Sequence, residues 1–153
     1  MEIPKSVAER LKEKGYDLTQ IVEIILKFLN IDPDTSSKVH KELAIAMFNE
    51  GVKLSEKGDV VQSSEKLYNA IEESIKALAI AKGLDEVKEA ENEGRWTTSL
   101  LDKAALKLGE EISRAWEAAF FLHINGFHEA TITVDEVTSR IPLIKKVIDS
   151  LNF

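Results

Sequence analysis

Apolar side chains recur every three to four positions along almost the whole chain, and this helical period is the feature that most limits the fold. The row Leu67, Ile71, Ile75 and Leu78 is one example. Seven glycines and three prolines in 153 residues leave few interruptions. The most strand-like stretch, residues 131–134, stands alone, without hairpin turns and a partner strand. We therefore predict an all-α fold in which helices pack against helices.

Local signals indicate where several of these helices begin and end. Asp17 with Gln20, and Thr133 with Glu136, have the spacing of capping boxes. Pro142 lies inside the last apolar row and should kink or divide that helix. The connections are short, so sequential helices should pack antiparallel.

The chain divides by pattern into a front part and a main part. We predict an N-terminal helical hairpin over residues 1–31, and over residues 32–153 an antiparallel bundle of four long helices plus one extra helix. The charged segment 83–94 is interpreted as a solvated connector. The helix over 112–122 is apolar on nearly all sides, which favours a central position, and Gly126 should end it. Gly51, inside a helical row, indicates close approach of a neighbouring helix.

Composition narrows the classes of protein. A hydrophobic share of 44% and a charged share of 31% are typical of a folded domain. Without cysteine there is no disulfide, thiolate metal site or thiol nucleophile. The longest apolar stretch, 118–122, is too short to cross a bilayer and no export signal is evident, so we expect a cytoplasmic protein with no membrane role. The net charge of −7 disfavours nucleic acid as a partner.

The richest group of polar side chains follows the most apolar helix. His123, His128 and Glu129 could bind a divalent metal or transfer protons. Their spacing is not the i, i+4 pattern of a metalloprotease helix, because Gly126 intervenes. The alternative is structural: His123 is a core histidine that donates to a carbonyl, and the other two cap the turn.

Three further residues are candidate contacts to a nucleotide or phosphate: Arg114, Lys76 and Trp96. Arg114 and Glu117 form an i, i+3 pair, which we interpret as exposed, and Glu72 with Lys76 an i, i+4 pair on the solvent side. A glycine-rich phosphate loop and a recognisable serine triad are both missing from the sequence. No catalytic residue and no cofactor is assigned, and we favour a protein that is not an enzyme.

Several segments together resemble the archaeal PaREP family. They are residues 67–79, Trp96-Thr97-Thr98, Trp116, and the most specific string, Leu-His-Ile-Asn-Gly-Phe-His-Glu at 122–129. The resemblance covers most of the chain, including residues 3–34. It implies an archaeal, heat-adapted source.

The PaREP family is in turn similar in architecture to HEPN domains, helical bundles of nucleotide-binding proteins and RNA-cleaving toxins. The ribonucleases among them carry an arginine followed by a histidine after four to six residues. Between Arg114 and His123 there are eight residues, so the pattern is broken and ribonuclease activity is not implied.

These observations favour a binding or interaction module with a HEPN-like fold that forms a homo-oligomer, most simply a dimer, or binds a protein partner. The wide apolar surface of the helix after Asp17 motivates self-association. The alternative is a nucleotide- or metal-binding protein, or a degenerate RNA-cleaving domain, that uses His123, His128 and Glu129.

Overall fold

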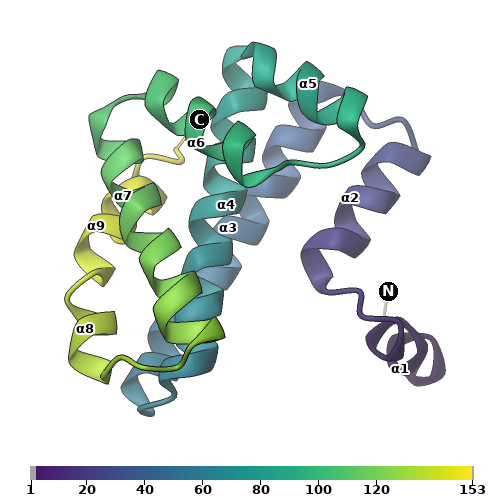
Figure 1. The fold of residues 1–153 in the computed structure, drawn as a ribbon. Coiled ribbons are helices and arrows are strands. Elements are labelled where there is room, and N and C mark those ends of the chain that lie inside the picture. Colours follow the sequence, from purple (N-terminus) through teal and green to yellow (C-terminus); the bar gives the residue numbers. More distant parts are fainter. Residues whose placement is uncertain (1–2, 153) are drawn as a thin grey trace. The chain divides into compact units, whose positions relative to one another are not determined.

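The computed structural model describes residues 3–152, and within that range it contains helices and turns but no strand (Figure 1). The prediction of an all-α fold is confirmed. The most strand-like stretch, 131–134, forms a bend that leads into a helix. Within the described residues, no helix is both long enough and apolar enough to span a membrane.

The described chain divides between Asp32 and Pro33 into two compact units. The first unit contains two helices, α1 (Lys5–Glu13) and α2 (Leu18–Phe28). Helix α2 begins with the predicted capping box: Asp17 Oδ1 accepts from the Gln20 backbone N–H at 2.9 Å, and Gln20 Oε1 accepts from the Asp17 N–H at 3.0 Å.

The second unit is a helical bundle built around one long helix. Its elements are α3 (Pro33–Glu56), α4 (Val60–Lys82), α5 (Asp85–Glu93), α6 (Thr98–Leu108), α7 (Glu110–Phe121), the π-helix η1 (Leu122–His128), α8 (Val134–Thr138) and α9 (Ile141–Asp149). Helix α4 contacts every other element of this unit (Figure 1).

The central helix is therefore α4. The sequence favoured the apolar helix over 112–122 for this position, and that prediction was wrong. Helix α4 is surrounded because several of its buried positions are small, among them Ser63, Ser64 and Ala70, and small side chains let neighbours approach from several sides. Helix α7 keeps Arg114 and Glu117 on an exposed face.

Helices α3 and α4 pack closely at Gly51, as the sequence predicted. A Cβ at that position would lie 2.9 Å from the Cγ and Cδ2 atoms of Leu67 and 3.3 Å from its backbone nitrogen. Both residues are buried.

The charged segment 83–94 contains a helix, α5, which the sequence analysis did not predict, although most of its charged side chains are solvated as expected. The charged residue Glu86 is buried in this helix, and its Oε2 lies 2.8 Å from Lys107 Nζ on α6. Ala90, one turn later, is also buried. The ion pair between Glu86 and Lys107 holds α5 against α6. The period of apolar residues does not reveal a contact made by charged side chains.

The helix after α7 continues where the sequence predicted an end. Gly126 lies inside η1, and a Cβ there would be 2.0 Å from Ser64 Oγ and 2.6 Å from Ser64 Cβ on α4. This glycine allows close approach of η1 to α4 and does not terminate the helix.

The C-terminal helical row is divided, as Pro142 predicted. The Thr133–Glu136 capping box starts α8, and Pro142 stands in the first turn of α9. Val137 of α8 and Ile144 of α9 both reach the core.

We expect Gly126→Ala to lower the free energy of unfolding by about 2 kcal/mol or more, because overpacking against a fixed side chain is costly. Gly51→Ala should cost less, because the far end of the Leu67 side chain can move. Urea unfolding followed by far-UV circular dichroism measures both. Equal costs, or a greater cost at Gly51, would contradict this account of the η1 contact.

Candidate functional site

Two of the histidines singled out in the sequence meet on η1. Their Nε2 atoms are 3.1 Å apart, and the rings stand edge to face with centroids 4.4 Å apart. In a π-helix the backbone bonds run from i to i+5, so residues five apart lie nearly above one another. Both residues were candidates from the sequence, but their pairing depends on a helix that continues past Gly126, where the sequence predicts an end.

His123 is held in place from several sides. Its Nδ1 lies 2.8 Å from Glu65 Oε2 on α4, its ring stacks on Tyr68 with centroids 4.1 Å apart, and Phe127 lies parallel at 6.1 Å. A carboxylate can only accept here, so in the neutral imidazole Nδ1 carries the proton and the Nε2 lone pair of His123 faces His128. Sequence reasoning proposed a carbonyl as the partner and missed Glu65, which lies 58 positions away.

The third residue of that predicted group is placed differently. Glu129 is exposed immediately after η1, where its backbone N–H donates to the Ile124 carbonyl at 2.9 Å. His128 is exposed too, whereas His123 is partly buried. The histidine pair therefore opens to solvent on the His128 side.

From Glu65 a row of polar side chains continues along one face of α4. Tyr68, Glu72 and Lys76 follow at intervals of three or four residues, the spacing that aligns side chains on a helix. Tyr68 hydrogen-bonds to Glu72, and Lys76 Nζ lies 3.6 Å from Glu72 Oε1. The sequence placed the last pair on the solvent side, but Lys76 is only 5% exposed. That interpretation was wrong because these residues face the neighbouring helices.

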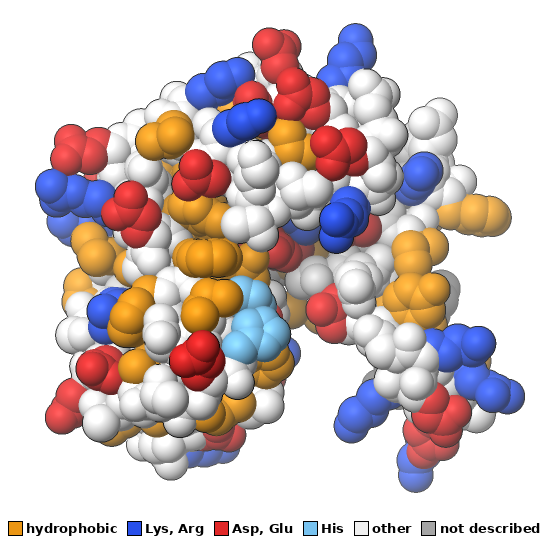
Figure 2. Space-filling view, viewed as in Figure 1, with side chains coloured by type: hydrophobic (Ala, Val, Ile, Leu, Met, Phe, Trp, Pro, Cys, Tyr) orange, Lys and Arg blue, Asp and Glu red, His pale blue; other side chains and the backbone are white. Residues whose placement is uncertain are grey.

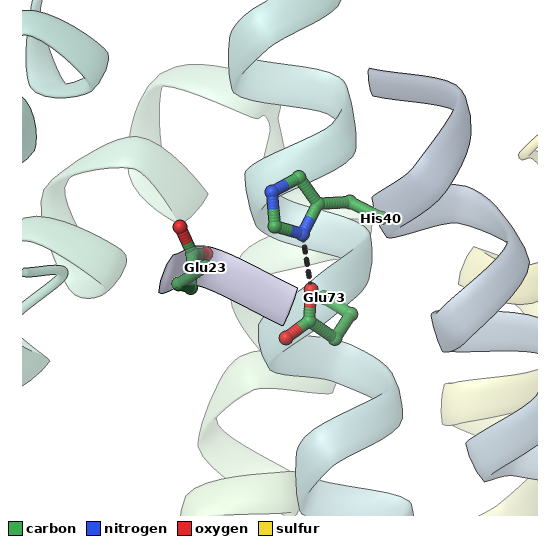
Figure 3. A group of neighbouring side chains, drawn as sticks. All are labelled: Glu23, His40 and Glu73. Carbon is green, nitrogen blue, oxygen red and sulfur yellow. Dashed lines mark hydrogen bonds and ion pairs between the residues drawn. The ribbon is translucent and has the colours of Figure 1, made fainter. Parts of the chain in front are cut away.

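The row ends in a buried pair between α3 and α4. Lys76 Nζ lies 3.4 Å from Glu73 Oε1, and the other oxygen of Glu73 bonds to His40 Nδ1 (Figure 3). His40 and Glu73 are both buried. They are 33 positions apart, so only the packing of the two helices reveals the pair.

Burial shifts the acid–base behaviour of this row. It raises the pKa of the Tyr68 phenol, and the negative charge of Glu72 adds to the shift, so the hydroxyl stays protonated and remains a donor. Burial also raises the pKa of Glu72, against the opposing effect of the Lys76 ammonium. Folding therefore favours the neutral form of the Glu72 carboxyl.

The candidate phosphate contacts do not gather at the histidine pair. Arg114 is exposed and pairs with Glu110 at 3.1 Å, one turn back along α7, and not with Glu117. Lys76 belongs to the buried row, and Trp96 is half-buried before α6. Among the residues that the structure describes, these three do not form a shared phosphate pocket with His123.

An open groove of about 660 Å³ adjoins the histidines. Its largest lining side chains are apolar, and Trp116 is anchored there by a 3.1 Å hydrogen bond from Nε1 to Asp102 Oδ1. Phe120 lines the groove and also lies 6.2 Å, centroid to centroid, from His123. Figure 2 shows apolar side chains gathered beside histidine side chains on this face. The groove is formed by parts of α6, α7 and η1: Thr98, Ser99, Asp102, Trp116, Glu117, Phe120, Phe121, Ile124 and Asn125.

Together these features define a helical-bundle protein with an apolar groove and a solvent-facing histidine pair at one end of α7. The chain belongs to the archaeal PaREP1/PaREP8 family, whose model matches residues 39–148. The family prediction is confirmed over that range, while residues 3–34 lie outside the match.

Solved structures of similar proteins support the same assignment. The crystal structure of a Sulfolobus solfataricus protein, a structural-genomics target, is 35% identical, with a TM-score of 0.66, over 71% of this chain and 92% of that one. A solution structure of the same target is 34% identical, with a TM-score of 0.63, over 71% of this chain and 88% of that one. No curated protein matches the chain. The likeness to HEPN domains stays a prediction.

We predict that Glu72→Gln becomes progressively more stabilising, relative to the wild type, as the pH rises. Folding raises the pKa of Glu72, so its contribution to stability is complete below the unfolded pKa of about 4.3 and is lost as the pH rises through the folded value. Glutamine has no charge to bury. Melting temperatures of both proteins between about pH 4 and pH 8 measure the difference.

Glu86→Gln should show the opposite pH dependence to Glu72→Gln. The hydrogen bond from Lys107 lowers the pKa of Glu86, so its contribution to stability is present above the unfolded pKa and is lost as the pH falls through the folded value. This variant should therefore become more destabilising as the pH rises. If the melting-temperature differences of the two variants from the wild type change with pH in the same direction, the pKa shifts assigned to Glu72 and Glu86 are wrong.

Proposed function

We propose that the protein is a binding module that self-associates through the apolar groove, with α2 of a second copy as the occupant. The observation that carries the proposal is that one chain offers both a groove and an apolar helix face. Catalysis plays no part in it.

The groove has the character of a site for apolar side chains. Trp116, Phe120, Phe121 and Ile124 line it, and its volume of about 660 Å³ is in the range of sites that hold sizeable ligands or side chains. Asp102 is engaged by the indole of Trp116. Thr98 and Ser99 add polar groups beside an apolar floor, which is the usual anatomy of an interface.

Helix α2 offers the complementary surface. Phe28 is 85% exposed, and Ile24, Ile25 and Leu29 are all exposed as well, so α1 leaves this face uncovered within the first unit. Phe28 follows Ile24 and Ile25 by four and three positions, and Leu29 follows Ile25 by four, so the side chains form one stripe. A contiguous apolar patch of this kind typically marks an interaction site.

We favour a second copy as the occupant because two copies that exchange their α2 helices form a closed dimer. If α2 of each copy enters the groove of the other, the twofold dimer covers the groove and the apolar face of α2 in both copies. Neither surface then remains exposed to add further copies into a fibre. A foreign partner would cover the groove but leave α2 exposed.

The proposed dimer is tested by measuring the molar mass in solution, by light scattering on a sizing column. The wild type should be a dimer, and both Phe28→Ser and Ile124→Ser should shift it to monomer while far-UV circular dichroism stays unchanged. Leu106→Ser is the matched control: Leu106 is 62% exposed on α6 but does not line the groove, so this variant should stay dimeric.

The other outcomes identify other occupants. A monomeric wild type in which Phe28→Ser changes the tryptophan emission would place the chain's own α2 in the groove, and a monomer without that change would favour a foreign partner. Either result overturns self-association, as does a dimer that survives both groove and α2 substitutions.

A metal-binding function, the alternative indicated by the sequence, is supported by a separate observation, the convergence of His123 and His128. Nucleotide binding and RNA cleavage have no comparable support among the described residues.

A further inference from the structure

We propose that His123 and His128 form a binding site for a divalent transition-metal ion that prefers imidazole, such as Zn²⁺, with Glu65 as the support of the first ligand. The site is independent of the groove and does not require self-association.

The distance between the two nitrogens fits a shared metal ion. Tetrahedral zinc has Zn–N bonds of 2.0–2.1 Å, which places two ligand nitrogens about 3.3 Å apart. The Nε2 atoms of His123 and His128 are 3.1 Å apart. A metal ion can therefore replace the hydrogen bond between them: the Nε2 proton of His128 is released to water, its Nδ1 carries the remaining proton, and small side-chain rotations turn both lone pairs toward the ion.

His123 is held in an orientation that suits a metal ligand. Glu65 Oε2 lies 2.8 Å from Nδ1 and accepts from it, so in the neutral imidazole the proton is on Nδ1 and the Nε2 lone pair is available to a metal ion. A carboxylate behind a ligating histidine fixes its tautomer and orientation and raises its basicity, and this arrangement recurs in zinc sites. The stacked Tyr68 limits rotation of the ring.

Both imidazoles are accessible from solvent. His123 retains 21% side-chain exposure and His128 is exposed, so an ion can reach both from solvent. Within residues 3–152, no third imidazole or carboxylate lies within 4.8 Å of both nitrogens. Two protein ligands leave the remaining positions to water or to a donor atom of a bound molecule, as in sites that keep open coordination positions.

The donor set also determines the class of metal. Imidazole nitrogen suits Zn²⁺, Ni²⁺ and Cu²⁺, whereas Mg²⁺ and Ca²⁺ take oxygen ligands. A site of two histidines should therefore bind the first group and ignore the second.

Isothermal titration with Zn²⁺, and with Mg²⁺ as the negative probe, tests the proposal on the full chain. We expect one Zn²⁺ per chain and no Mg²⁺ binding. Because His128 is exposed, His128→Ala should keep the fold, as checked by circular dichroism, and should weaken Zn²⁺ binding at least tenfold. Glu65→Gln should weaken it about tenfold, the effect expected for a supporting partner.

A matched control and a spectroscopic measurement make the result specific. Glu129→Gln, at an exposed carboxylate next to His128, should leave the affinity unchanged. In nitrogen NMR spectra, Zn²⁺ should shift the Nε2 resonances of His123 and His128 and spare those of His40. No binding up to about 1 mM Zn²⁺, or binding that His128→Ala leaves intact, would overturn the proposal.

Discussion

The second unit depends on how closely its helices approach α4. Gly51 of α3 lies against Leu67, and Gly126 of η1 lies against Ser64, so backbone meets side chain without an intervening Cβ. Neighbours can then surround one helix on several sides, which shields a larger part of it from water than a single apolar stripe would allow. The apolar face of α7, with Trp116 and Ala119 buried, packs against α4 and also against α6 and α9.

A polar row within such a bundle is costly, and its position limits how the helices can be arranged. Buried charges lose hydration, so each needs a partner at hydrogen-bond distance. Glu73 has partners in His40 on α3 and Lys76 on its own helix. A slide of α3 along α4 by one turn would separate His40 from Glu73 and leave a buried carboxylate without that partner. The pair thus favours one register of α3 on α4, where apolar contacts alone would tolerate several.

Much of the fold follows from local signals in the sequence, whereas the site depends on contacts between distant residues. The helical period, the capping residues Asp17 and Thr133, and the break at Pro142 act within a few positions, and the structure has each of them. Helix α5 was missed because its anchor is a charge, Glu86, paired across to α6. The histidines were identified by residue type, but Glu65, their support, is brought to them only by the packing of η1 on α4.

The π-helix has a consequence for how this segment could change in length. A π turn is an α-helix with one residue inserted, and such insertions are common at functional positions. Removing one residue between His123 and Gly126 would restore ordinary helical winding and bring the imidazoles to the i, i+4 spacing, which also lies on one face. The same deletion would rotate Gly126 away from Ser64 and bring a side chain against α4. The extra residue therefore lets one short segment satisfy two requirements, the pairing of the imidazoles outside and the close packing of backbone inside.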